Sequence, residues 1–276
     1  MPETSTTAVP SQHEKAKPGA DDTPTICAIS VVAAILANVL HEGVGHGLTA
    51  LLSGAPSGVL TTVAWSSAFD SRLVEAGGTL VNLVAALVFW LVLRSAKNAA
   101  MPMRYFLLVN CAFNLFSGTG YFFFSGVTNF GDWAAVISGL HSHWLWRTLL
   151  VVGGAAAYYA AVRVVGIGLV RYVGVPRDQQ SRMRNLTILP YFSAIVLSSL
   201  AGLLNPFGIQ LLWQSALPAT AGGQSGLLWL QYYIPRRAEP QRNPDAISRS
   251  FVWMIVAVVL AFVYVVVLGR GITVHH

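Results

Sequence analysis

Three ionisable side chains lie close together in an otherwise apolar stretch of the chain. They are His41, Glu42 and His46, within HEGVGH at residues 41–46. Ionisable residues inside a membrane span are costly and usually mark a functional site, and no Lys or Arg lies nearby to neutralise Glu42. Zn²⁺ binds neutral imidazole nitrogens and carboxylate oxygens, and a catalytic zinc site keeps one position for water. The pattern therefore predicts a divalent metal site, with zinc as the ion.

The spacing of the two histidines requires a local change in helix geometry. In H-E-x-x-H zinc helices the histidines are four residues apart and share one face, whereas His41 and His46 are five apart. At about 100° per residue, a regular helix would separate them by roughly 140° around its axis. A π-bulge absorbs one extra residue and is common at functional sites, and Gly43 and Gly45 make such a deformation easy. We therefore predict a π-type distortion between His41 and His46.

Other interpretations of these histidines stay open from the sequence alone. In a regular helix, Glu42 and His46 are four apart and could both bind the ion, with His41 turned away. Both imidazoles could instead make ordinary hydrogen bonds between helices. His141 and His143 could supply a replacement ligand, or they could anchor the membrane–water boundary beside Trp144 and Trp146.

The composition indicates the environment of this site. Of the 276 residues, 54% are hydrophobic and 10% are charged, whereas soluble domains carry about 25% charged residues. The mean hydropathy is +0.59. About 20 consecutive apolar residues cross a bilayer as a helix. Segments of this kind cover residues 25–52, 73–93, 103–124, 144–170, 186–204 and 251–268. The sequence therefore predicts an all-α, polytopic membrane bundle of six to seven transmembrane helices.

The segments outside these spans have their own signals. Residues 1–23 are polar and predict a disordered tail, and residues 53–72 predict a short hairpin or a membrane-dipping segment. Residues 207–234 are interrupted by ALPATAGGQSG, which is typical of a broken span or of re-entrant half-helices. The net charge of +6 comes from basic residues in short loops beside apolar spans, as the positive-inside bias places them. Nucleic acid is therefore not expected as a partner.

Three motifs in order resemble one family. HEGVGHGLTALLSG is similar to the H-E-x-x-H motif of the site-two protease family of intramembrane metallopeptidases. AGGTLVNLVAAL, residues 76–87, resembles the A-G-P-x-x-N segment of that family, with Asn82 at the Asn position. The third family motif ends in an aspartate, and NLFSGTGYFFFSGVTNFGDW resembles it with Asn114 and Asp132. Asp132 is also the only acidic residue between Glu75 and Asp178.

The resemblance covers about residues 30–140 and implies specific roles. It implies a zinc ion held by His41, His46 and Asp132, with Glu42 as the general base that activates a zinc-bound water. Asn82 and Asn114 would hydrogen-bond the substrate or the oxyanion. This sequence departs from the family pattern by the extra residue in HEGVGH, by Gly78 in place of proline, and by Trp133 after the aspartate. Residues 24–143 would form the metallopeptidase-like core, and residues 144–276 would add helices to the same membrane domain.

These observations lead to an expected function and two alternatives. We expect a zinc metalloprotease that hydrolyses peptide bonds in or near a membrane, embedded as a multi-pass protein in a bacterial inner membrane. Its expected partners are membrane lipids and a membrane protein or peptide substrate. A catalytically inactive scaffold or regulator would hold no metal. An ion transporter would place further polar residues along the later spans, and the sequence has few of these.

Overall fold

The chain folds into a bundle of long helices. The computed structural model describes residues 20–174, 180–205, 210, 213, 217–233 and 245–275. Within these residues, six helical segments are long and apolar enough to cross a membrane. They are Thr23–Leu52, Arg72–Ser95, Met101–Thr128, His143–Val173, Gln180–Gly202 and Phe251–Leu268. The predicted all-α, polytopic architecture is confirmed, and the chain is a multi-pass membrane protein.

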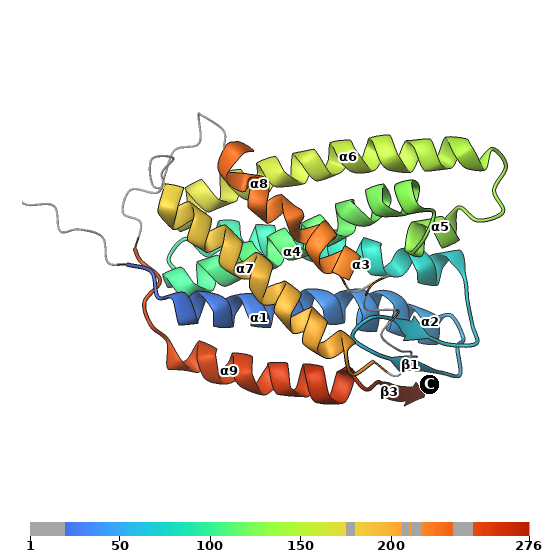
Figure 1. Cartoon of the computed structure of the whole chain (residues 1–276), viewed down its shortest axis with the longest axis horizontal. Coiled ribbons are helices and arrows are strands. Elements are labelled where there is room, and N and C mark those ends of the chain that lie inside the picture. The colour runs from blue at the N-terminus through green and yellow to red at the C-terminus, as the bar shows by residue number, and fades with distance from the viewer. Residues whose placement is uncertain are drawn as a thin grey trace, which may run out of the picture.

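The first crossing consists of three helical pieces. They are α1 (Thr23–Val39), the π-helix η1 (Leu40–Leu48) and α2 (Thr49–Leu52). Asp22 caps α1, because its side chain accepts a hydrogen bond from the backbone N–H of Thr25, and this satisfies one of the free N–H groups of the first turn. The last crossing, α9 (Phe251–Phe262) with η6 (Val263–Leu268), lies alongside α1 (Figure 1).

The helix at the centre of the bundle is α4 (Met101–Thr128). In its apolar 18-residue stretch 61% is buried inside the protein, whereas in the corresponding stretch of the last crossing 11% is buried. Its fully buried Tyr105, Phe113 and Phe116 contribute to the main core. Helix α3 (Arg72–Ser95) packs on one side of α4, and α6 (His143–Gly168), continued by η2 (Leu169–Val173), packs on another. Helix α7 (Gln180–Gly202) packs against α1.

A short turn after α4 places the predicted aspartate. The central helix ends at Asn129, which has a φ of 56°, and Gly131 follows with a φ of 83°. Positive φ is readily adopted by glycine, and among other residues most often by asparagine. The chain therefore reverses sharply, and Asp132 becomes the first residue of the short helix α5 (Asp132–Val136).

The predicted hairpin between the first two crossings is confirmed. Strands β1 (Ser57–Leu60) and β2 (Trp65–Ser66) pair antiparallel. The last described residues form a third strand, β3 (Ile272–His275), which pairs antiparallel with β1 and places Ile272 opposite Leu60. The sheet order is β2-β1-β3, so the end of the described chain packs on the first loop of the bundle (Figure 1). This strand was not predicted.

The interrupted segment near residue 220 is irregular, as predicted. It contains η4 (Pro218–Gly222), η5 (Gly223–Ser225) and α8 (Gly226–Tyr233), and α8 packs against α6 and α7. Residues 206–209, 211, 212 and 214–216 lie outside the described residues. A complete seventh crossing therefore stays a prediction.

The boundary of the predicted tail needs a correction. Residues 1–19 lie outside the described residues, but Asp21 is held in the fold and does not belong to a disordered segment. Its carboxylate accepts two hydrogen bonds from the guanidinium of Arg182, at 2.7 and 3.1 Å, and one from the backbone N–H of Ile247 at 2.7 Å. A single carboxylate therefore joins the starts of α1 and α7 to the segment that leads into α9.

We expect Asp21→Ala to destabilise the protein by about 1.5–3 kcal/mol, because hydrogen bonds to charged groups are the stronger ones. The measurement is thermal unfolding in detergent. Arg249→Gln is the matched control, since Arg249 makes a single 3.0 Å ion pair with Asp22 and its side chain is 60% exposed, where pairs are worth about 0–1 kcal/mol. Equal losses in both variants would contradict the structural role of Asp21.

Candidate metal centre

The predicted distortion between the two histidines is present. Residues Leu40–Leu48 form a π-helix, in which residues five apart are the hydrogen-bonded neighbours. His41 and His46 therefore lie on the same face, and their Nε2 atoms are 3.3 Å apart. The alternative in which Glu42 and His46 bind together while His41 turns away is not the arrangement observed.

Glycines allow this π-helix to lie directly against α3. A Cβ atom on Gly45 would collide with the backbone of Gly78, and a Cβ on Gly77 would collide with the carbonyl of Gly45. A Cβ on Gly78 would lie 2.7 Å from Nε2 of His41 and closer still to Nε2 of His46. The two backbones therefore touch, and the side chain missing at Gly78 leaves open the space that both imidazoles face.

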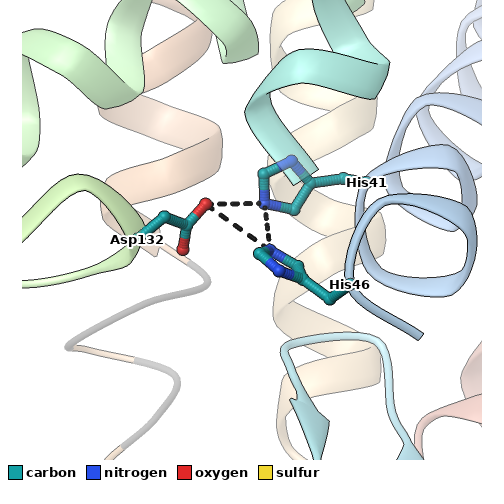
Figure 2. A group of neighbouring side chains, drawn as sticks. All are labelled: His41, His46 and Asp132. Carbon is teal, nitrogen blue, oxygen red and sulfur yellow. Dashed lines mark hydrogen bonds and ion pairs between the residues drawn. The ribbon is translucent and has the colours of Figure 1, made fainter. Parts of the chain in front are cut away.

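Asp132 completes a group of three potential ligands. Its Oδ2 atom lies 3.4 Å from Nε2 of His41 and 3.5 Å from Nε2 of His46. Figure 2 shows the carboxylate approaching from α5 toward the two imidazoles on the first crossing. Among the described residues, only these three form such a group, so His141 and His143 are not part of it. His143 instead hydrogen-bonds Oδ1 of Asn129 at 2.9 Å.

The second nitrogen of each imidazole is held by an oxygen atom. Nδ1 of His41 lies 2.6 Å from Oδ1 of Asn82, and Nδ1 of His46 lies 2.8 Å from the carbonyl oxygen of Val74. An amide oxygen and a carbonyl can only accept, so Nδ1 of each ring is the donor. In each neutral ring the lone pair is then on Nε2, the nitrogen that faces Asp132. Such outer partners commonly fix the orientation of metal-binding histidines.

A chain of buried amides fixes the orientation of Asn82 itself. Its Nδ2 donates to Oδ1 of Asn114 at 2.7 Å and to the carbonyl of Ala37 at 3.2 Å. Nδ2 of Asn114 in turn donates to the carbonyl of Asn110 at 2.9 Å. Both N–H groups of Asn82 are thus used inside the bundle, and its oxygen must face His41. The structure therefore gives Asn82 and Asn114 an orienting role at His41, and their contact with substrate or oxyanion stays a prediction.

The three facing atoms fit a bound cation. The Oδ2 atom of Asp132 is buried and accepts no hydrogen bond of good geometry from the described residues. Its distances of 3.4 and 3.5 Å to the imidazoles exceed the 2.7–2.9 Å of charge-assisted hydrogen bonds. Ligands of a tetrahedral zinc ion with bonds of about 2.0–2.1 Å are separated by about 3.3–3.4 Å. The observed separations agree with that value, and the ligand types are those that zinc prefers.

The carboxyl group of Asp132 is in the form that binds metals. Burial by itself raises the pKa of Asp132, but the adjacent imidazoles of His41 and His46 outweigh it and hold that pKa below its ordinary value. The group is therefore an ionised carboxylate at neutral pH. An ionised carboxylate is the protonation state that a metal ligand requires.

Glu42 lies beside the group without belonging to it. Its side chain is buried, and the backbone of Trp65, in the hairpin, lies near the carboxylate. The hairpin thus borders Glu42. Glu42 is the one carboxylate on the helix that carries both histidines, immediately after His41.

Two cavities border this centre. The larger has a volume of about 560 Å³, is mostly apolar, and includes Asp132 and Tyr121 in its lining together with Phe124, Tyr158 and Trp229. The smaller has a volume of about 70 Å³ and is lined by His41 and Glu42 with more polar neighbours. Ser117, Tyr121 and Ala219 line both cavities. The centre therefore lies between an apolar groove and a small polar pocket.

Comparison with known proteins does not identify the chain: no family model, curated protein or solved structure matched it. What the centre can do must therefore be argued from its own geometry.

We expect Gly78→Ala to abolish metal binding, because the added methyl group would occupy the space between the two Nε2 atoms. The measurement is the zinc content of the purified protein by elemental analysis. Gly153→Ala is the matched control, since Gly153 lies in α6 and a Cβ there would meet no atom within 4 Å. A Gly78→Ala protein with full zinc content would contradict the proposed position of the ion.

We expect Asn82→Leu to weaken zinc affinity by about 10–100-fold, the usual cost of removing the partner that orients a ligand. Competition with a chelator measures this affinity. Asn82→Asp keeps an oxygen that can accept from Nδ1 of His41 and is expected to lose less. Equal affinities in the wild type and in Asn82→Leu would show that the buried amides do not orient His41.

Proposed function

We propose that this protein is an intramembrane zinc metallopeptidase that hydrolyses peptide bonds in or near the membrane. The observation that carries the proposal is the convergence of His41, His46 and Asp132 on one point, with Glu42 adjacent. Three protein ligands leave the fourth position of a tetrahedral ion open, as in catalytic zinc sites. A purely structural zinc site would be closed by four ligands.

The division of tasks follows from the positions of the side chains. When bound, zinc would supply Lewis acidity, which lowers the pKa of water to about 7 and polarises a carbonyl group. Glu42 would take the proton as the water oxygen attacks the peptide carbonyl carbon, and it would return that proton to the amine nitrogen as the C–N bond breaks. His41 and His46 would remain neutral ligands, because Asn82 and Val74 hold the protons on their Nδ1 atoms.

The surroundings of the centre support an apolar polypeptide as the substrate. The groove of about 560 Å³ reaches Asp132 and is walled largely by aromatic and aliphatic side chains. Binding sites of this volume and character take apolar ligands with a few polar contacts. Several groove residues, such as Phe123, Val127 and Trp229, are also 43–53% exposed on the outer surface, where a membrane-embedded segment would arrive from the lipid.

The cellular context belongs to the same proposal. The apolar helices support a membrane location with lipids as neighbours, and the bacterial inner membrane is the compartment we propose. A scaffold without catalytic activity needs no oriented ligands, and buried amides that hold one imidazole tautomer argue for a bound ion instead. An ion transporter would need a polar path through the bundle, whereas the groove at this centre is mostly apolar.

Two variants separate metal binding from catalysis. We expect His46→Ala to lose zinc, and we expect Glu42→Gln to keep zinc but lose hydrolysis of a membrane-embedded peptide by at least about a hundredfold, the lower end of general-base effects. Elemental analysis gives the zinc content, and mass spectrometry of a transmembrane peptide in vesicles gives the hydrolysis rate. His141→Ala is the matched control, because His141 is exposed and does not belong to the group of potential ligands.

The decisive contradictory result concerns the wild type. Wild-type protein that contains no zinc after purification without chelator would overturn the enzyme proposal. Zinc retained in His46→Ala would overturn the assignment of His46 as a ligand while leaving a metal site elsewhere.

A further inference from the structure

We propose that the small polar pocket beside Glu42 is a built-in water site, and that Gln224 of η5 positions the water in it. The pocket is lined by His41 and Glu42 on one side and by Asn38, Thr62 and Gln224 on others. The binding of water rests on this pocket alone. Its use in hydrolysis rests on the function proposed above.

Gln224 presents an unused acceptor at this pocket. It is only 5% exposed, and its Nε2 donates to Oγ of Ser117 at 2.9 Å and to the carbonyl of Phe113 at 3.3 Å. The carbonyl of Phe113 can only accept, so it determines which end of the amide is nitrogen. Its Oε1 atom is then left buried without a hydrogen-bond partner among the described residues. A buried carbonyl oxygen without a partner costs free energy unless water satisfies it.

Two further oxygen atoms that line this pocket also lack a hydrogen-bond partner among the described residues. Oδ1 of Asn38 and Oγ1 of Thr62 are buried and have no hydrogen-bond partner in the described part of the chain. Asn38, Thr62 and Gln224 come from α1, the hairpin and η5, so three distant parts of the sequence each bring an unsatisfied oxygen to one pocket. A buried water makes about three hydrogen bonds of this kind.

The size and position of the pocket suit water better than an apolar ligand. A volume of about 70 Å³ accommodates roughly two water molecules at about 30 Å³ each. Its lining is more polar than that of the groove, which approaches the centre at Asp132 rather than at Glu42. Water held here could reach Glu42 without crossing the apolar groove. A peptide in the groove and water in the pocket would thus approach the centre from different directions.

Radiolytic labelling tests this site directly. A brief X-ray pulse converts bound water to hydroxyl radicals, which oxidise adjacent side chains, and mass spectrometry measures the rate for each residue. Phe113 lines the pocket, whereas Phe116, on the same helix and equally buried, lines neither cavity. We expect Phe113 to be oxidised faster than Phe116 in the detergent-solubilised full chain. Equal slow rates at both residues would overturn the water site.

Substitutions then test the role of Gln224. We expect Gln224→Leu and Thr62→Val to lower oxidation of Phe113 toward the rate of Phe116 and to lower kcat by about 10–100-fold, the range expected for a misplaced reactant. Zinc content should stay unchanged. Thr119→Val is the matched control, because the Thr119 hydroxyl bonds the carbonyl of Leu115 and lines neither cavity. Unchanged Phe113 oxidation in Gln224→Leu would overturn the positioning role.

This experiment distinguishes a failure of the water-site proposal from a failure of the peptidase proposal. Rapid Phe113 oxidation in a wild type that lacks zinc would uphold the water site and overturn the peptidase. Zinc and hydrolysis present with Phe113 as slow as Phe116 would uphold the peptidase and overturn the water site.

Discussion

The close contact between the π-helix and α3 is the constraint on which the rest of the centre depends. Gly45 faces Gly77 and Gly78. A Cβ at Gly45 or Gly77 would collide with the opposite backbone, and a Cβ at Gly78 would collide with the two imidazoles. Small residues at membrane helix interfaces allow such close approach, since the lipid provides no hydrophobic force between helices. Here the contact does more than join two helices, because it places the carbonyl of Val74 and the amide of Asn82 within hydrogen-bonding distance of the two imidazoles.

The central helix links this contact to the remaining parts of the site. Its Asn114 orients Asn82, its Tyr121 stacks on the ring of His41, and the turn that ends it delivers Asp132. A polar network inside a bundle is stable only when its members are satisfied. In this protein the hydrogen-bonded amides of Asn82 and Asn114 orient a ligand, and three oxygens without a partner among the described residues, on Asn38, Thr62 and Gln224, line the pocket beside Glu42. Amides whose hydrogen bonds are made inside the protein thus hold the structure, whereas the pocket amides keep an oxygen available to bind water.

Several features could be predicted because they depend on local sequence. The lengths of the apolar runs determine the crossings, and the five-residue interval with Gly43 and Gly45 was sufficient to predict a π-helix between His41 and His46. Asp132 was the only acidic residue in a long stretch of sequence. Its selection therefore did not require knowledge of the turn at Gly131 that brings it to the imidazoles.

Other features depend on contacts between distant segments and could not be predicted in this way. A buried amide can meet a substrate or another side chain, and only the packing of α1, α3 and α4 shows that Asn82 meets His41. The strand β3 is short, and its pairing with β1 joins segments more than 200 residues apart. Gln224 lies in a Gly-rich break, where its importance depends on which carbonyls its amide reaches. For the close packing of α3 on the π-helix, the available signal in the sequence was the pair Gly77-Gly78 within an apolar helix.

The π-helix also has a consequence for how such a site tolerates changes in length. Inserting one residue into a regular helix rotates everything after it by about 100°, which would normally destroy a ligand pair carried on one helix. Here the wider turn absorbs the additional residue, and His41 and His46 remain neighbours. Helix-borne metal sites can therefore survive single-residue insertions where glycines permit the wider turn and a neighbouring helix lies close enough to hold it.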